Sequence, residues 1–194
     1  MKLQIILGST RPNRQSEKLA KWVVNEAKKL SDTDVALVDL ADYPMPFLDE
    51  PMSPRFNSKR NINEQAGKWV NKLGEGDAYI FVTPEYNHSI SGVLKNAIDY
   101  ITFELTKKPS SIVSHGTVGG ARATMHLKEI LSESQSVPIP RSVAFAGAGQ
   151  NLDEYGNLSE EFSSKPYGPQ VALKNMLEEL KWYSDALSDA RNKN

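Results

Sequence analysis

The sequence predicts a doubly wound α/β fold, in which helices cover both faces of a parallel sheet. Short apolar runs alternate along the chain with longer segments whose apolar residues have helical spacing. The run 79–82 is apolar throughout, as expected for a parallel strand that is covered on both faces. The length of 194 residues indicates one domain, residues 1–194, with a substantial core.

The first part of the chain predicts a strand at 3–7, a helix at about 15–30 and a second strand at 34–40. The segment 61–64 resembles a capping box with its first asparagine as the cap, so a second helix is expected to begin there. Glycines soon after Leu73 end that helix. The apolar run described above then supplies the third strand.

The segment 41–58 is predicted to be irregular, because its four prolines forbid a regular helix or a central strand. A loop of this length inside a compact domain is more often functional than idle. Its apolar side chains, which need something to pack against, are Tyr43, Phe47, Leu48 and Met52. A pocket wall, a subunit contact and packing on the same domain are all compatible with them.

The second part of the chain continues the alternation of helices and strands. The predicted elements are a helix at 93–101, a shorter fourth strand within 109–115, a helix at 121–133, a fifth strand near 142–146 and a final helix with apolar residues from Leu173 to Leu187. A glycine-rich, acidic loop is expected over 147–164, and a polar tail ends the chain. The role of that loop is left open.

Three unusual loops, 8–16, 83–89 and 114–120, follow strands one, three and four. In the flavodoxin-like strand order 2-1-3-4-5 these strands are neighbours, and ligands bind where the strand order reverses. The sequence therefore predicts that the three loops converge on one crevice at the carboxyl edge of the sheet.

The first of these loops has the chemistry of a phosphate site. It leads into a helix, whose free N–H groups and positive dipole end attract anions. Ser9, Thr10 and Ser16 add hydroxyl donors, and Arg11 and Arg14 add positive charge. Its single glycine matches neither the dinucleotide motif nor the P-loop. The alternative is that Ser16 only caps the helix and the arginines are solvated charge.

The other two loops suit a flat heterocycle. A rigid turn after the third strand can present backbone groups to the polar rim of such a ring, and Tyr86 can pack against its face. Glycines after the fourth strand allow the backbone to approach a ligand closely. Ordinary turn chemistry is the alternative in both loops. Glu85 has no partner carboxylate, so it is a weak candidate for a catalytic base.

Composition excludes several classes of function. The formal net charge is −1 and no segment is strongly basic, so neither nucleic acid nor an anionic membrane is indicated as a partner. No apolar run is long enough for a membrane span, and the chain lacks cysteine, so a cytoplasmic location is expected. The three histidines form no zinc-binding pair, and no hydrolase Gly-x-Ser-x-Gly elbow is present.

The motifs resemble the NAD(P)H-dependent FMN reductases of flavodoxin-like fold, which include quinone, chromate and azo-dye reductases. The resemblance covers most of the chain up to about residue 150. It rests on Gly8-Ser9-Thr10-Arg11 with Ser16, on Pro84-Glu85-Tyr86-Asn87, on the 92–100 segment, on the 39–46 segment, and on Gly116, Gly119 and Gly120.

This resemblance implies roles for individual residues. Ser9, Arg11 and Ser16 bind the FMN phosphate, with Thr10, Asn13 and Gln15 as additions on position only. The residues that line the isoalloxazine ring are Pro84, Glu85, Tyr86 and Asn87. Those that bracket its other polar side are Ser114, Gly116, Gly119 and Gly120. It implies no catalytic side chain and no metal, because the chemistry occurs at flavin N5.

The resemblance further implies a ping-pong reaction. NADPH or NADH passes hydride to the flavin and leaves, and a small acceptor such as a quinone, flavin, azo compound or chromate then takes the electrons. Family members usually form homodimers or homotetramers. Two alternatives remain open at this point: a non-enzymatic flavodoxin-type electron carrier, and a nucleotide-binding regulatory protein without chemistry.

Overall fold

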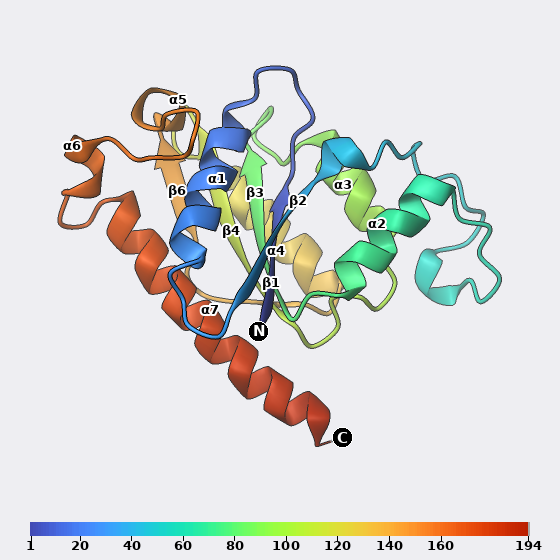
Figure 1. The fold of residues 1–194 in the computed structure, drawn as a ribbon. Helices are drawn as coiled ribbons and strands as arrows, with labels where there is room; N and C mark the ends of the chain where they lie inside the picture. The colour runs from blue at the N-terminus through green and yellow to red at the C-terminus, as the bar shows by residue number, and fades with distance from the viewer. Residues whose placement is uncertain (194) are drawn as a thin grey trace.

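The computed structural model describes residues 1–193 and has a parallel sheet as its middle layer (Figure 1). The strands are β1 Lys2–Leu7, β2 Asp34–Asp39, β3 Ala78–Pro84, β4 Pro109–Gly116, β5 Val137–Pro138 and β6 Val143–Ala146. Their order is β2-β1-β3-β4-β5, with β6 also paired to β4, and every pairing is parallel. This confirms the predicted order 2-1-3-4-5.

Helices cover both faces of the sheet, as predicted (Figure 1). They are α1 Gln15–Ala27, α2 Glu64–Gly74, α3 Gly92–Asp99, α4 Ala121–Glu133, α5 Ala148–Asn151, α6 Glu160–Ser163 and α7 Pro169–Asn192. Successive strand residues point to opposite faces, so Ile5 packs with α1 and α7 while Ile6 packs with α2, α3 and α4. Within residues 1–193, every helix is too short or too polar to cross a bilayer.

The fifth position in the sheet is filled by two short strands instead of one. Ile139 N–H still donates to the carbonyl oxygen of Ser110 at 2.8 Å. Pro140 follows and has no N–H to donate, so pairing with β4 resumes only at Val143. The expected strand near 142–146 is therefore β6, and β5 is a short piece that the sequence analysis missed.

The expectation of a shorter fourth strand was wrong, because β4 has eight residues and β3 has seven. Two serines hide the start of β4 from the hydropathy pattern, although both are buried. Ser111 donates to the carbonyl oxygen of Arg141 at 2.9 Å, and the hydroxyls of Ser110 and Ser136 lie 2.8 Å apart. Satisfied hydrogen bonds let these polar side chains occupy a buried strand.

Several helix boundaries differ from the sequence prediction. α1 ends at Ala27 instead of about residue 30. The cap of α2 is Asn63, whose side chain accepts from Gln65 N–H at 2.9 Å, and not Asn61. α7 continues to Asn192 without fraying, and the last residue of the predicted tail lies outside the described part of the chain. Two single-turn helices, α5 and α6, lie in the predicted 147–164 loop.

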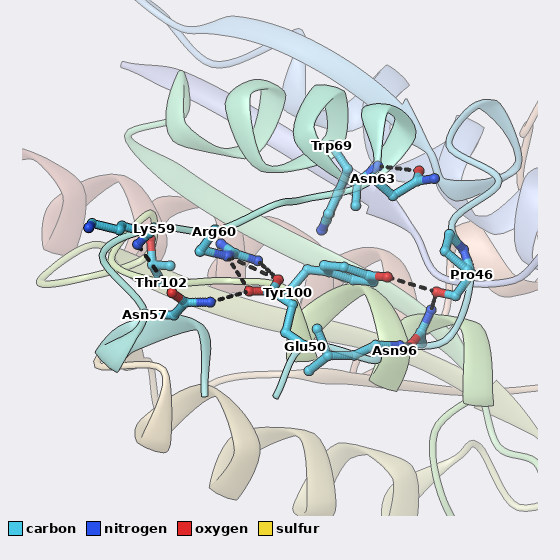
Figure 2. Close-up of polar contacts among 12 residues, drawn as sticks. Pro46, Glu50, Asn57, Lys59, Arg60, Asn63, Trp69, Asn96, Tyr100 and Thr102 are labelled. Carbon is cyan, nitrogen blue, oxygen red and sulfur yellow. Dashed lines mark hydrogen bonds and ion pairs between the residues drawn. The ribbon is translucent and has the colours of Figure 1, made fainter. Parts of the chain in front are cut away.

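The proline-rich segment 41–58 is irregular apart from short 3-10 turns, as predicted, and it is tied to the domain (Figure 2). Asn96 accepts from Leu48 N–H at 3.0 Å, and both Asn96 and Tyr100 donate to the carbonyl oxygen of Pro46. Arg60 grips the Glu50 carboxylate with bonds of 2.6 and 3.0 Å. These contacts favour packing on the same domain as the main role of this segment.

Candidate functional site

The structure brings the three predicted loops together at the carboxyl edge of the sheet. The hydroxyls of Ser9 and Tyr86 lie 3.1 Å apart and join the first loop to the second. Glu85 N–H donates to the carbonyl oxygen of His115 at 2.9 Å and joins the second loop to the end of β4. Ser16 Oγ lies 2.7 Å from His115 Nε2, which links the start of α1 to the same strand. The loops therefore border a single site.

The start of α1 offers a set of anion donors. Its N-cap residue is Arg14, whose side chain makes no capping hydrogen bond, and Ser16 is the second residue of the helix. This contradicts the alternative that Ser16 is the cap. Ser9 and Ser16 are buried, whereas Thr10 and Arg11 are exposed. Free N–H groups, hydroxyls and a guanidinium at one helix end are the chemistry that a phosphate needs.

The two arginines of this loop have different surroundings. The Arg14 guanidinium donates to the carbonyl oxygen of Ser9 and to the carboxylate of Asp39, and its side chain is only 11% exposed. Within residues 1–193, Arg11 forms no ion pair, and its guanidinium carbon lies 5.4 Å from the centre of the Tyr86 ring. Arg14 therefore holds the loop in shape, and Arg11 is the cation that a ligand can use.

Asp39 is a contributor that the sequence analysis missed. It ends β2 directly beside Leu7, the last residue of β1. An acidic residue at the end of the strand next to an arginine-containing loop was the available signal, because adjacent parallel strands end at the same edge. The ion pair with Arg14 fixes the shape of the loop before any ligand arrives.

The second loop is a tight hairpin. Tyr86 and Ser89 exchange backbone hydrogen bonds of 2.8 and 3.0 Å. The two residues between them, Asn87 and His88, have φ of 49° and 67°. Two central residues with positive φ define a type I′ turn, which matches the twist of paired strands. The backbone here therefore forms the tight turn that was expected, and the contact of Tyr86 and Asn87 with a flat ring stays a prediction.

Glu85 acts on α4 through its carboxylate. It accepts from Arg122 N–H at 3.0 Å and from Ala123 N–H at 3.4 Å, and it pairs with the Arg122 side chain at 3.2 Å. Burial raises the pKa of Glu85, but these hydrogen bonds outweigh it and hold the pKa below its ordinary value. The lowered pKa makes Glu85 a weak proton acceptor, and both of its carboxylate oxygens are occupied by donors at the start of α4, so its side chain serves as a cap of that helix. The side chain of Arg122 is thus paired with Glu85.

The third loop depends on its glycines. Gly119 and Gly120 have φ of +83° and +81°, and a Cβ on Gly120 would lie 2.8 Å from Ser114 Cβ. The Ser114 hydroxyl donates to the carbonyl oxygen of Gly119 at 2.8 Å and lies 2.9 Å from that of Thr124. Ser114 and these two glycines therefore build the turn. Gly116 lies next to Glu85, with 3.3 Å from its ideal Cβ position to Glu85 Cβ.

His115 is the second residue whose contact the sequence analysis missed. Burial lowers its pKa to about 4, so the imidazole is neutral at pH 7. Its hydrogen-bond partner, Ser16, lies 99 residues away, and no motif joins the two. Within residues 1–193, no group of three or more histidine or acidic side chains is placed to hold a metal ion.

Hollows lie on both sides of the first loop. One of about 350 Å³ borders Thr10 and is lined mainly by apolar residues, including Tyr43, Met45 and Phe47. The other, of about 560 Å³, borders His115 and Gly116 and has a more polar wall that includes Gln15 and Thr117. The second hollow lies beside the predicted ring-binding residues.

Comparison with known proteins agrees with this geometry. The strand order defines the class of flavodoxin-like proteins, and the donors at the start of α1 are compatible with an anionic ligand. A family model described as NADPH-dependent FMN reductase matches residues 1–150. The chain therefore belongs to the NADPH-dependent FMN reductase family, and it is an oxidoreductase that uses FMN and NAD(P)H.

Curated relatives carry the same description. An NAD(P)H-dependent FMN reductase of Schizosaccharomyces pombe is 30% identical over 184 residues, which cover 85% of this chain and 92% of the relative. An FMN-dependent NADPH-azoreductase of Staphylococcus haemolyticus is 31% identical over 148 residues, covering 74% of this chain and 76% of the relative.

Solved structures show the same fold. FerB, a flavoenzyme NAD(P)H:(acceptor) oxidoreductase of Paracoccus denitrificans, has a TM-score of 0.74 at 20% identity, over 95% of this chain and 97% of its own. Flavodoxin 1 of Bacillus cereus has a TM-score of 0.57 at 14% identity, over 93% of this chain and 97% of its own.

The residues present fit an FMN. Arg11 and the uncapped start of α1 suit a doubly charged phosphate. The Tyr86–Ser89 hairpin and the close backbone at Gly116 suit a flat ring with polar edges.

Proposed function

We propose that this protein transfers electrons from NAD(P)H to a small acceptor such as a quinone, a flavin, an azo compound or chromate, in a ping-pong reaction. The observation that carries the proposal is the uncapped start of α1, with Arg11 free of ion pairs within residues 1–193. It supports a phosphate at that position, and hence an FMN whose ring extends toward the other two loops.

The proposal assigns residues to the cofactor. Ser9, Arg11 and Ser16 hold the phosphate. The ring lies along Pro84, Glu85, Tyr86 and Asn87 on one side and along Ser114, Gly116, Gly119 and Gly120 on the other. The contacts described above refine these roles. The side chains of Glu85 and Ser114 shape the loops, so they act on the ring through the backbone that they position.

The chemistry that FMN supplies when bound is the acceptance of a hydride from NAD(P)H and the return of its electrons to the acceptor. The chain orients the ring and offers N–H donors to the negative charge that reduction places on it. No side chain has to act as a nucleophile or a strong acid. The single domain is proposed to form a homodimer or homotetramer in the cytoplasm, and the exposed Val118 and Met125 near the site suit a subunit contact.

The alternative functions receive less support. A regulatory protein without chemistry does not agree with membership in a reductase family. The likeness to flavodoxin 1 concerns the fold alone, so it gives no support to an electron carrier.

Initial-rate kinetics test the proposal. With NADPH and a quinone varied together, a ping-pong reaction gives parallel double-reciprocal lines, and azo dyes and chromate can then be compared as acceptors. Intersecting lines would contradict the two-step scheme. An R11A variant with unchanged rates at limiting FMN would contradict the phosphate assignment.

A further inference from the structure

The hydrogen bond between Ser16 and His115 joins the start of α1 to the end of β4. Ser16 is the second residue of α1, and its side chain is buried. Its hydroxyl oxygen lies 2.7 Å from His115 Nε2. The same hydroxyl is one of the donors proposed for the FMN phosphate. Whether Ser16 can donate its proton to a phosphate therefore depends on which ring nitrogen of His115 carries a proton.

The position of His115 is fixed by its backbone. The residue lies near the carboxyl end of β4, between Pro84 of β3 and Phe145 of β6. Its carbonyl oxygen accepts from Glu85 N–H at 2.9 Å. His115 thus contacts the second loop through its backbone and the start of α1 through its imidazole.

The imidazole is neutral at working pH, because burial holds the pKa of His115 near 4. A neutral imidazole has a single N–H, on Nε2 or on Nδ1. If Nε2 carries the proton, it donates to Ser16 Oγ, and the serine proton remains free. If Nδ1 carries it, Nε2 must accept the only proton of Ser16, which then has none to give to an anion.

We propose that His115 is a positioning residue for the FMN phosphate: it donates from Nε2–H to Ser16 Oγ and thereby directs the Ser16 hydroxyl proton to a phosphate oxygen. The inference rests on the proposed phosphate site. It extends that site to a residue from β4 and explains why a buried serine at the start of α1 is paired with a half-buried histidine. The Nε2–H tautomer leaves the Ser16 proton free for the phosphate, and the hydrogen bond that this proton makes strengthens the binding of FMN.

The first test compares FMN with riboflavin, which lacks the phosphate. Flavin fluorescence quenching gives both dissociation constants, and their ratio isolates the phosphate contribution. In H115F the preference for FMN is expected to fall about tenfold, in the range of one hydrogen bond to a charged acceptor, while riboflavin affinity stays the same. H115Q, whose amide N–H can reach Ser16, is expected to retain most of the preference.

Matched variants separate this role from general damage to the fold. S16A is expected to lose the same preference for FMN. The S16A/H115F double variant is expected to lose no more of this preference than S16A does, because the two residues act as one unit. H126F changes a histidine that contacts Ser89 of the hairpin and lies away from the phosphate loop, so the ratio of FMN to riboflavin affinity is expected to stay at the wild-type value. A wild-type ratio in H115F, or additive losses in the double variant, would overturn the proposal. If the wild type bound FMN and riboflavin with equal affinity, that result would instead contradict the proposed phosphate site.

The second test needs no loss-of-function variant. Nitrogen-15 correlation spectra of the histidine rings distinguish the two tautomers, and the chain has only three histidines to assign. In the FMN complex of the wild type, His115 is expected to carry its proton on Nε2, with the signal assigned by its absence from H115Q. A proton on Nδ1 in that complex would overturn the proposal even if H115F did not fold.

Discussion

Replacing His115 with glutamine is expected to change how the stability of the protein depends on pH. The pKa of His115 is lowered from 6.5 to about 4 by burial. Each unit of such a difference corresponds to about 1.4 kcal/mol, so the neutral, buried imidazole is linked to at most about 3 kcal/mol of stability.

The sign follows from which state binds the proton. The unfolded chain takes up a proton on this histidine near pH 6.5, whereas the folded protein resists protonation until about pH 4. This contribution is therefore complete above pH 6.5 and is lost as the pH falls toward 4. Glutamine does not titrate, so H115Q should lack this part of the acid sensitivity.

Urea unfolding of the flavin-free protein between pH 7 and pH 4 measures the effect, with flavin left out because bound ligand adds its own stabilisation. The wild type is expected to lose up to about 3 kcal/mol more than H115Q over this range. H126Q, at an exposed histidine, should follow the wild type. Parallel curves for wild type and H115Q would refute the reasoning.

Four further substitutions separate the roles of other residues near the site. R11A should weaken FMN binding about tenfold or more without lowering the melting temperature. R14A should lower the free energy of unfolding in urea by about 2–3 kcal/mol, because it leaves Asp39 without its partner. The reverse pattern would show that the two arginines have exchanged roles. G120A should cost at least about 1–2 kcal/mol, because its φ is +81° and its new Cβ meets Ser114; a neutral result by calorimetry would disprove that constraint. E85Q should cost about 1 kcal/mol through the weakened cap of α4, with an unchanged pH profile of the reaction; a shifted profile would identify a proton-transfer role.

Much of the fold follows from the sequence because it depends on local patterns. The alternation of apolar runs and helical segments predicted a doubly wound parallel sheet, and the strand order was taken from the flavodoxin-like pattern. The prolines of segment 41–58 excluded regular structure there. The sequence analysis missed the split of the fifth strand at Pro140, and it also underestimated the length of β4. Hydropathy counts a serine as polar, but Ser110 and Ser111 are buried because their hydroxyls find partners far along the chain.

The candidate site could be located from the sequence, but the roles of its side chains could not. Arg11 and Arg14 differ only in what surrounds them, and the partner that occupies Arg14 comes from the end of β2. The pairing of Ser16 with His115 spans 99 residues and arises because the end of β4 meets the start of α1. Such contacts are set by tertiary structure, so neither spacing nor residue type reveals them.

The central claim is that this chain binds FMN and reduces it with NAD(P)H for delivery to an acceptor. The most direct measurement is a visible spectrum of the purified protein after addition of FMN and desalting, followed by anaerobic NADPH and then a quinone. We predict a retained flavin band that NADPH bleaches and the quinone restores. A flavin that is lost on desalting, or one that is retained but not bleached, would contradict the account.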